Sequence, residues 1–368
     1  MKILVISSSA IPAPIEDGYG GLEAITGWLT LEFAKRGNDV TLVTTKGSTW
    51  EGNHPVMQDG QQIGNMNVVC TVEPSWTGNQ EFEHYKVYKD LLEKEFSGPD
   101  SVVIDHTWFC YSYFSKAKFP EMNILHTHHG MLGFHTPPPG VLHPRFLGLS
   151  TYHAQFMSNI LNVPVRHIHN GIPLVQFPPD YDPQIDKGDY LLSLNRITDE
   201  KGIHDAIDVA IGTNTPIVIV GDDTRVVSQM YVNNIIERCR NSNGLARYYG
   251  LVDNATKNSL ILKCKALIAC PKQTWLEAFG LYAVEGMAYY KPMLALNNGG
   301  LNDIVVHGFN GFLAPNTERL KSYVSQIDNI DPKNCRIIVE NNFSKEIMAS
   351  HYLDMFQKII DKDQTMYW

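Results

Sequence analysis

The chain has 368 residues, of which 43% are hydrophobic and 19% charged, and its formal net charge is −9 at pH 7. This hydrophobic fraction excludes an intrinsically disordered chain, and the length favours two globular domains over one. The acidic balance argues against nucleic acid as the main partner, because such a surface needs clustered lysine and arginine.

Cysteine usage and hydropathy indicate the compartment. The six cysteines are scattered without a C-x-x-C pair, which is typical of reduced thiols. The apolar run at the N-terminus is too short for the core of a signal peptide, and no later stretch approaches the length of a membrane span. We therefore expect a cytoplasmic protein without a transmembrane segment, and peripheral contact with a membrane stays open.

The first elements predict a parallel sheet. Residues 2–6 read as a buried strand, residues 22–33 as a helix with periodic apolar positions, and residues 40–43 as the next strand. This β-α-β order indicates a doubly wound sheet that binds ligands at the carboxyl ends of its strands. The Gly20-Gly21 pair opens the helix, but thirteen residues separate it from the first strand. That spacing excludes the glycine fingerprint of nicotinamide-dinucleotide sites.

Histidines gather after a strand-like run at residues 122–125. His126, His128 and His129 allow three interpretations. The first is a metal site that uses His126 and His128, although no third and fourth ligand follow at suitable spacing. The second is a structural role at the strand end, and the third is contact with a substrate. The proline-rich loop at residues 135–140 is expected to border an acceptor pocket, and an Asn-Gly turn at 170–171 precedes a linker.

The second half of the chain begins with a strand at residues 190–194. It delivers Asn195 and Arg196 to its carboxyl end, and Lys201 follows five positions after Arg196. An arginine fork and a lysine point charge at this spacing can hold a diphosphate from two sides. The alternative, a solvated turn, explains Lys201 well and Arg196 poorly. A further strand at residues 215–220 ends at Gly221.

The stretch from residue 266 to residue 311 carries most of the functional argument. A buried strand at 266–270 is followed by Glu277 in a loop and by a predicted helix that starts at Phe279 and continues to about residue 291. Within that helix Leu281 and Glu285 share one face. The free N–H groups around Gly280 form an anion site. Two carboxylates with an anion site between them suit a nucleoside-diphosphate sugar, whereas two solvated glutamates are the simpler alternative.

The string Glu277-Ala278-Phe279-Gly280 with Glu285, followed by Lys-Pro, Gly-Gly and Asn-Gly pairs, resembles the E-x7-E region of the family 4 retaining glycosyltransferases. Arg196 and Lys201 match the R-x4-K-G pattern of the same family. The resemblance implies an α/β protein of the GT-B fold, with two Rossmann-like, doubly wound parallel-sheet domains facing a central cleft. The expected domains are residues 1–178 on the acceptor side and 185–343 on the donor side, and a C-terminal helix in 344–368 packs back on the first.

The activity implied by the resemblance is transfer of a hexose, with retention, from a nucleoside-diphosphate sugar such as UDP-glucose to an acceptor hydroxyl. No metal and no cofactor beyond the donor are expected. The alternatives are another GT-B enzyme, such as a sugar-nucleotide epimerase, or a non-catalytic sugar-nucleotide-binding protein. The expected catalytic residues are His129, with His128 as second choice, Arg196, Lys201 and Glu277. The expected donor-binding residues are Gly20, Gly21, Asn195, Gly221, Ala278, Phe279, Gly280, Leu281 and Glu285.

Overall fold

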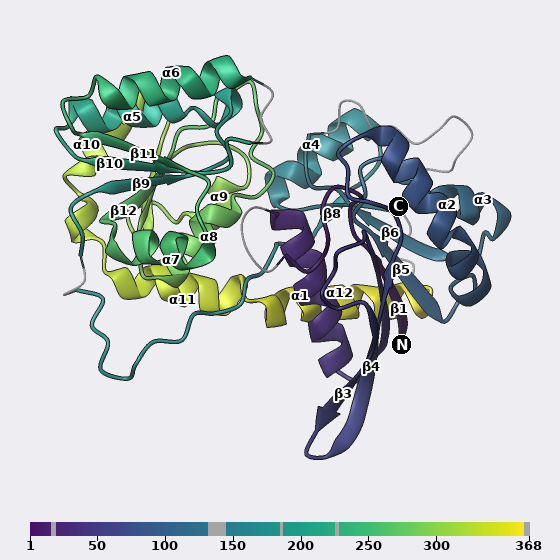
Figure 1. The fold of residues 1–368 in the computed structure, drawn as a ribbon. Coiled ribbons are helices and arrows are strands. Elements are labelled where there is room, and N and C mark those ends of the chain that lie inside the picture. The colour runs from purple at the N-terminus through teal and green to yellow at the C-terminus, as the bar shows by residue number, and fades with distance from the viewer. Residues whose placement is uncertain (16–19, 132–144, 185–186, 225–227, 364–368) are drawn as a thin grey trace. The chain divides into compact units, whose positions relative to one another are not determined.

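The computed structural model describes residues 1–15, 20–131, 145–184, 187–224 and 228–363 (Figure 1). It divides into two compact units. The first unit contains the described residues up to Pro173 and those from Lys345 onward, and the second contains Leu174–Ser344. The proline-rich loop expected at an acceptor pocket lies outside the described residues. No described helix is long and apolar enough to cross a lipid bilayer.

The first unit is built on an eight-stranded sheet in which all neighbours are parallel except the β3–β4 pair. In spatial order its strands are β3 (Gly52–Gln58), β4 (Gln61–Cys70), β2 (Asp39–Thr44), β1 (Lys2–Ile6), β5 (Ser101–Asp105), β6 (Asn123–Thr127), β7 (Arg145–Gly148) and β8 (Arg166–His167). Its helices are α1 (Gly21–Lys35), α2 (Gly78–Glu95), α3 (Ser112–Lys118), α4 (Thr151–Leu161) and α12 (Lys345–Ile360). The central strands are buried on both faces, as the apolar runs in their sequences predict.

Between residues 45 and 121, where no helix or strand is predicted, the structure has β3, β4, α2, β5 and α3. The edge strand β3 contains Pro55 and few β-branched residues, so its composition does not indicate a strand. Pro55 is tolerated because β3 is an edge strand, which among the described strands pairs only with β4.

Helix α12 lies beside α1, as the yellow and purple ribbons in Figure 1 show. The ring of Phe33 on α1 meets the rings of Tyr352 and Phe356 on α12, at centroid distances of 6.3 and 5.6 Å. Lys345 forms an ion pair with the buried Glu32. The C-terminal helix therefore belongs to the first unit, which confirms the prediction that it packs back.

The second unit is built on a six-stranded, fully parallel sheet. In spatial order its strands are β11 (Ala246–Gly250), β10 (Ile217–Val220), β9 (Leu191–Leu194), β12 (Ala266–Ala269), β13 (Met293–Leu296) and β14 (Gly311–Ala314). Its helices are α5 (Ile203–Gly212), α6 (Gln229–Arg240), α7 (Asn254–Lys263), α8 (Leu281–Ala288), α9 (Leu301–Ile304), α10 (Thr317–Val324) and α11 (Pro332–Asn342). In Figure 1, α5 and α6 lie above this sheet, and α7, α8 and α11 lie below it.

Helix α8 is shorter at both ends than the sequence predicts. It begins at Leu281 rather than Phe279, because Gly280 has φ +103° and cannot be part of a right-handed helix. It ends at Ala288, two residues before Tyr290, whose φ of +62° is also incompatible with a helix. Glu277 and Ala278 therefore lie in a loop that is fixed by the left-handed turn after it.

Candidate functional site

The carboxyl ends of β9 and β12 meet at the middle of the second sheet. The chain runs outward from β9 through β10 to β11 on one side, and from β12 through β13 to β14 on the other. Because the strand order changes direction between β9 and β12, a crevice forms there in open parallel sheets. The loops that follow β9 and β12 carry Arg196, Lys201 and Glu277, so three of the expected site residues reach this point.

Lys201 and Glu277 form a close ion pair. The distance from Lys201 Nζ to Glu277 Oε2 is 2.6 Å, and the two side chains are only 13% and 9% exposed. The hydroxyl of Tyr282 donates to the same Glu277 oxygen at 3.3 Å. Burial, together with the negative charge of Glu277, raises the pKa of Tyr282 well above its usual value, so this hydroxyl stays a donor. Glu277 is therefore not a solvated glutamate.

The backbone of Glu277 is held by the loop that follows β13. Its N–H donates to Asn298 Oδ1 at 2.8 Å, and its carbonyl accepts from the N–H of Gly300 at 2.7 Å. A Cβ atom on Gly299 would lie 2.1 Å from the Glu277 carbonyl oxygen, so only glycine allows this approach. The Gly-Gly pair in the sequence is thus a packing requirement of the Glu277 loop.

Asn298 is a residue that the sequence analysis missed. Besides accepting from Glu277, its amide donates to the carbonyls of Lys272 and Trp275, at 3.0 and 2.8 Å. One buried side chain therefore holds three points of the loop between β12 and α8. Its position directly before the Gly-Gly pair was the available signal, but a single asparagine in a turn has no specific pattern.

The start of α8 lies just beyond this loop. Ala278 and Phe279 are buried, and Gly280 is in close contact with Leu301, because an added Cβ would lie 2.9 Å from its side chain. The first turn from Leu281 carries the positive end of the helix dipole, and within it the N–H of Ala283 donates to the Gly280 carbonyl at 2.9 Å. This end of the helix is therefore suited to an anion.

Glu285 lies one turn into α8 and is also paired. Its Oε1 is 3.0 Å from Nζ of Lys257 on α7, and the two side chains are 24% and 23% exposed. The partner was not predicted, because Lys257 lies 28 residues earlier in the chain. Glu285 keeps enough exposure to accept hydrogen bonds from a ligand.

The loop after β9 presents Arg196 next to the buried Asn195. Arg196 Nη2 donates to Glu200 Oε1 at 3.2 Å, and its buried Nε has no partner among the described residues. Both polar side-chain atoms of Asn195 also lack a partner within the described chain. A Cβ on Gly221 would lie 1.5 Å from the Asn195 carbonyl oxygen, so this glycine lets β9 and β10 approach each other. Buried polar atoms without partners are typical of a binding site, in which a ligand supplies the missing hydrogen bonds.

In the first unit, Gly20 and Gly21 stand at the start of α1, as expected. A Cβ on Gly20 would lie 2.5 Å from the side-chain ends of Ile11 and Ile15. The hydroxyl of Ser8, in the loop after β1, donates to the buried carboxylate of Glu23 on α1. Part of the expected glycine loop, residues 16–19, lies outside the described residues.

The predicted histidines lie where β5 and β6 end. His106 Nδ1 is 2.8 Å from His129 Nε2, and His126 Nε2 is 3.5 Å from His128 Nδ1. His126 Nδ1 is also 3.6 Å from Oδ1 of the buried Asp105. Among the described residues of this unit, no three such groups come close enough together to share one ion. His128 is buried whereas His129 is partly exposed, so His129 is the more accessible of the two candidates.

Burial keeps the imidazoles of His106, His129 and His153 neutral. Burial lowers the pKa of His106 to about 3 and that of His153 to about 4, and it holds the pKa of His129 well below its usual value. For Asp105, burial acts to raise the pKa, but the nearby His126 ring and the hydrogen bonds from Ser112 and Thr107 outweigh it and lower the pKa to about 2. This edge of the first sheet thus offers the uncharged imidazoles of His106 and His129 near one buried carboxylate, Asp105.

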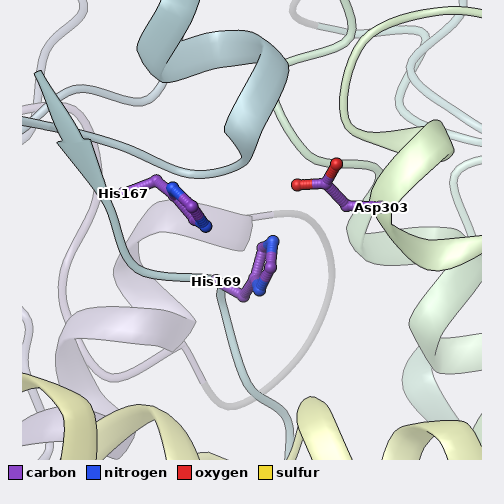
Figure 2. A group of neighbouring side chains, drawn as sticks. All are labelled: His167, His169 and Asp303. Atoms are coloured by element: carbon purple, nitrogen blue, oxygen red, sulfur yellow. The ribbon is translucent and has the colours of Figure 1, made fainter.

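Another pair of histidines lies at the end of β8 (Figure 2). The rings of His167 and His169 have centroids 4.9 Å apart and are tilted by 56°. Both come from the first unit, whereas Asp303, also drawn in Figure 2, lies on α9 of the second. Two imidazoles alone are fewer ligands than a protein metal centre uses.

Known proteins resemble both the second unit and the whole fold. The family model described as "Glycosyl transferases group 1" matches residues 182–344. D-rhamnosyltransferase WbpZ of Pseudomonas aeruginosa is 33% identical over 116 residues, which is 31% of this chain and 29% of that protein. Alpha-1,3/1,6-mannosyltransferase ALG2 of Dictyostelium discoideum is 32% identical over 112 residues, or 27% and 26% of the two chains. The matches thus span less than a third of either relative.

A glycosyltransferase structure from Rickettsia africae ESF-5 superposes with a TM-score of 0.71, at 18% identity, over 98% of this chain and 99% of that one. The likeness at this identity concerns the fold, and it confirms the predicted GT-B architecture of two parallel-sheet α/β domains. The family match confirms the expected relation of the second unit to glycosyltransferases.

Proposed function

We propose that this chain, whose residues 182–344 form a glycosyl transferases group 1 domain, transfers a hexose from a nucleoside-diphosphate sugar to an acceptor hydroxyl. The observation that carries the proposal is the buried Lys201–Glu277 pair at the carboxyl ends of β9 and β12, held by Asn298 next to the start of α8. A cation, a fixed carboxylate and a helix N-terminus in one loop cluster suit a ligand that joins a phosphate to a sugar.

Arg196 and Lys201 would stabilise the negative charge that develops on the leaving diphosphate. Both are already positioned by carboxylates, Glu200 and Glu277, so they need little reorganisation when the charge appears. The first turn of α8 would add its dipole on the same phosphate groups. Lysine and arginine in these places take the role that a divalent ion has in other phosphoryl sites, which is why we propose transfer without a metal.

The two glutamates would bind hydroxyl groups. Glu277 keeps one oxygen on Lys201 and Tyr282, and its second oxygen would accept from hydroxyls of the transferred sugar. Glu285, which is about a quarter exposed, would accept from the ribose hydroxyls. In the first unit, the neutral imidazole of His129 would hydrogen-bond a sugar hydroxyl without attracting the phosphates.

The finer parts of the proposal are a UDP-hexose donor, UDP-glucose above others, and retention at the anomeric carbon. The names of the two sequence relatives include rhamnosyl and mannosyl transfer, so donors of those sugars belong in the same test. The acceptor is an alcohol of unspecified class, and we propose that the reaction takes place in the cytoplasm.

The test is a thermal-unfolding series with UDP-, GDP- and ADP-sugars, on the native chain and on Arg196→Ala and Glu285→Ala. A donor at a hundred times its Kd stabilises a protein by about 2.7 kcal/mol, which is an increase in Tm of several degrees. We expect one nucleotide series to raise Tm in the native chain and neither variant to respond. Controls are Arg238→Ala on α6 and Glu318→Ala on α10, which remove the same charges elsewhere in the second unit.

If no nucleotide sugar raises Tm at millimolar concentration, or if the control variants lose the response as well, the donor site is assigned wrongly. Once a donor is known, release of free sugar or of an isomerised donor without any acceptor would favour a hydrolase or an epimerase. NMR of the product then gives its anomeric configuration, and activity in EDTA tests whether a divalent ion takes part.

A further inference from the structure

A cavity of about 250 Å³ opens at the amino-terminal edge of the first sheet. Its walls include Asn123 and Arg145, which are the first residues of β6 and β7, and Lys116 from α3. The last turn of α12 closes one side with Ile359 and Ile360. The cavity lies at the opposite ends of the strands from the histidines, so it is separate from the site described above.

Two cations, Lys116 and Arg145, line this cavity together with the carboxylates of Glu121 and Asp363. Lys116 Nζ donates to the carbonyls of Pro120 and Met122, at 3.2 and 2.5 Å. An ammonium group has three protons, so these carbonyls leave one unused. Burial lowers the pKa of Lys116, and the neighbouring charge of Arg145 lowers it further. The fold thus holds two like charges close together in a partly desolvated place.

Arg145 provides the second observation. Its Nη1 is buried and has no hydrogen-bond partner within the described chain. Its backbone N–H donates to the hydroxyl oxygen of Tyr113. The guanidinium keeps its positive charge, because arginine does not lose its proton in proteins. Glu121, which also lines the cavity, is 72% exposed and lies 3.9 Å from Lys362, so it is a weak counter-ion at the rim.

We propose that this cavity binds a phosphate monoester group through Arg145 and Lys116. A guanidinium fork and an ammonium match the charge and the several acceptor oxygens of a phosphate dianion better than those of a single carboxylate. The apolar side chains of Met122 and Ile359 provide a surface for a small organic part. The proposal does not depend on the glycosyl-transfer function, because every residue in it belongs to the first unit.

Isothermal titration calorimetry with glycerol 3-phosphate tests the proposal on the native chain, on Arg145→Gln and on Lys116→Gln. Lys118→Gln is the matched control, because it removes the same charge from the same helix at an exposed position. Arg196→Ala shows whether the ligand binds in the second unit instead. We expect either cavity variant to weaken binding at least tenfold, and Lys118→Gln and Arg196→Ala to leave it unchanged.

A phosphate group on a lipid has the same chemistry as a free ester, so a second arm uses sedimentation with vesicles. Phosphatidic acid in phosphatidylcholine is compared with phosphatidylcholine alone. Binding to the acidic vesicles that is lost in Arg145→Gln identifies the ester as a lipid headgroup, whereas calorimetric binding alone identifies a soluble metabolite. The proposal is wrong if neither probe binds at millimolar concentration, or if binding survives in both cavity variants. Urea unfolding of each variant verifies that it remains folded.

Discussion

The carboxyl ends of the two sheets differ in the charge of their functional side chains. In the second unit the functional side chains are charged and paired: Lys201 with Glu277, and Arg196 with Glu200. In the first unit one buried carboxylate, Asp105, lies at the same edge as His106 and His153, whose imidazoles burial keeps neutral. Similar backbone architecture thus supports two kinds of binding surface.

The difference teaches what each edge can recognise. Paired ions can exchange a carboxylate for a ligand phosphate, because both partners are anions and the cation remains satisfied. A neutral imidazole has one donor and one acceptor nitrogen and no net charge. Such groups therefore favour hydrogen bonds to the hydroxyl groups of an uncharged ligand, such as a sugar or an alcohol. The two edges also respond differently to acid and to removal of single charges, and four experiments exploit this.

Acidification is expected to have the largest effect and to separate the two units. Burial lowers the pKa of His84, His106 and His153 in the first unit to about 4, 3 and 4. At these three histidines the unfolded chain binds more protons than the folded one below about pH 6.5, so their contribution to stability falls as pH drops through that value toward the folded pKa values. Glu81, whose pKa burial raises to about 7, acts in the opposite direction and offsets part of this loss. At pH 4.5 the loss is on the order of 2 kcal/mol for each histidine.

The second unit is expected to lose less, because neither of its histidines, His204 and His307, is buried. Urea unfolding of Trp275→Phe measures the first unit alone by fluorescence, since Trp275 is the one tryptophan between residues 174 and 344. Far-UV circular dichroism follows both units. Equal urea midpoints for the first unit at pH 7 and pH 4.5 would contradict the neutral-histidine interpretation.

Replacing the central carboxylate is the next largest change. Asp105→Asn removes the charge that accepts from the N–H and hydroxyl of Thr107 and from the hydroxyl of Ser112. We expect a loss of about 3 kcal/mol in the stability of the first unit, because a buried ionic network loses its centre. Asp100→Asn, at an exposed position just before β5, is the matched control and should stay within about 0.5 kcal/mol of the native chain.

Breaking the ion pair of the second unit is expected to destabilise that unit by about 2 kcal/mol. Lys201→Met leaves the Glu277 carboxylate, which is only 9% exposed, without its cation. The double variant Lys201→Met/Glu277→Gln should regain most of this stability, since no isolated charge remains, yet it should not bind the donor. A double variant less stable than Lys201→Met would show that the pair is not coupled in this way.

The smallest effect on stability is expected at the partly exposed pair. Glu200→Gln frees Arg196, and we expect a change within about 0.5 kcal/mol, because both side chains are 26% to 30% exposed. Binding of a nucleoside diphosphate should nevertheless tighten severalfold, since Arg196 no longer has to leave a carboxylate. Glu237→Gln on α6 removes the same charge from an exposed site and should leave calorimetric binding unchanged.

The sequence by itself determined the architecture and the chemical types at the site. Buried strands such as β1 and β12 are apolar runs, and parallel strands bring their carboxyl ends to one edge, so Arg196 and Glu277 were predictable there without coordinates. The same reasoning did not predict β3, because its proline and polar residues are not typical of a strand. This edge strand is stabilised by pairing with its neighbour β4.

Only the tertiary structure decided the partners. Lys201 is 76 residues from Glu277, and Lys257 is 28 residues from Glu285, so no local pattern indicates which cation meets which carboxylate. Charge pairing, the burial that keeps His106 neutral and the lack of a partner for Arg145 Nη1 among the described residues all depend on distances across the fold. Periodicity determines which face of an element is buried, whereas desolvation and Coulomb energy depend on what lies opposite that face.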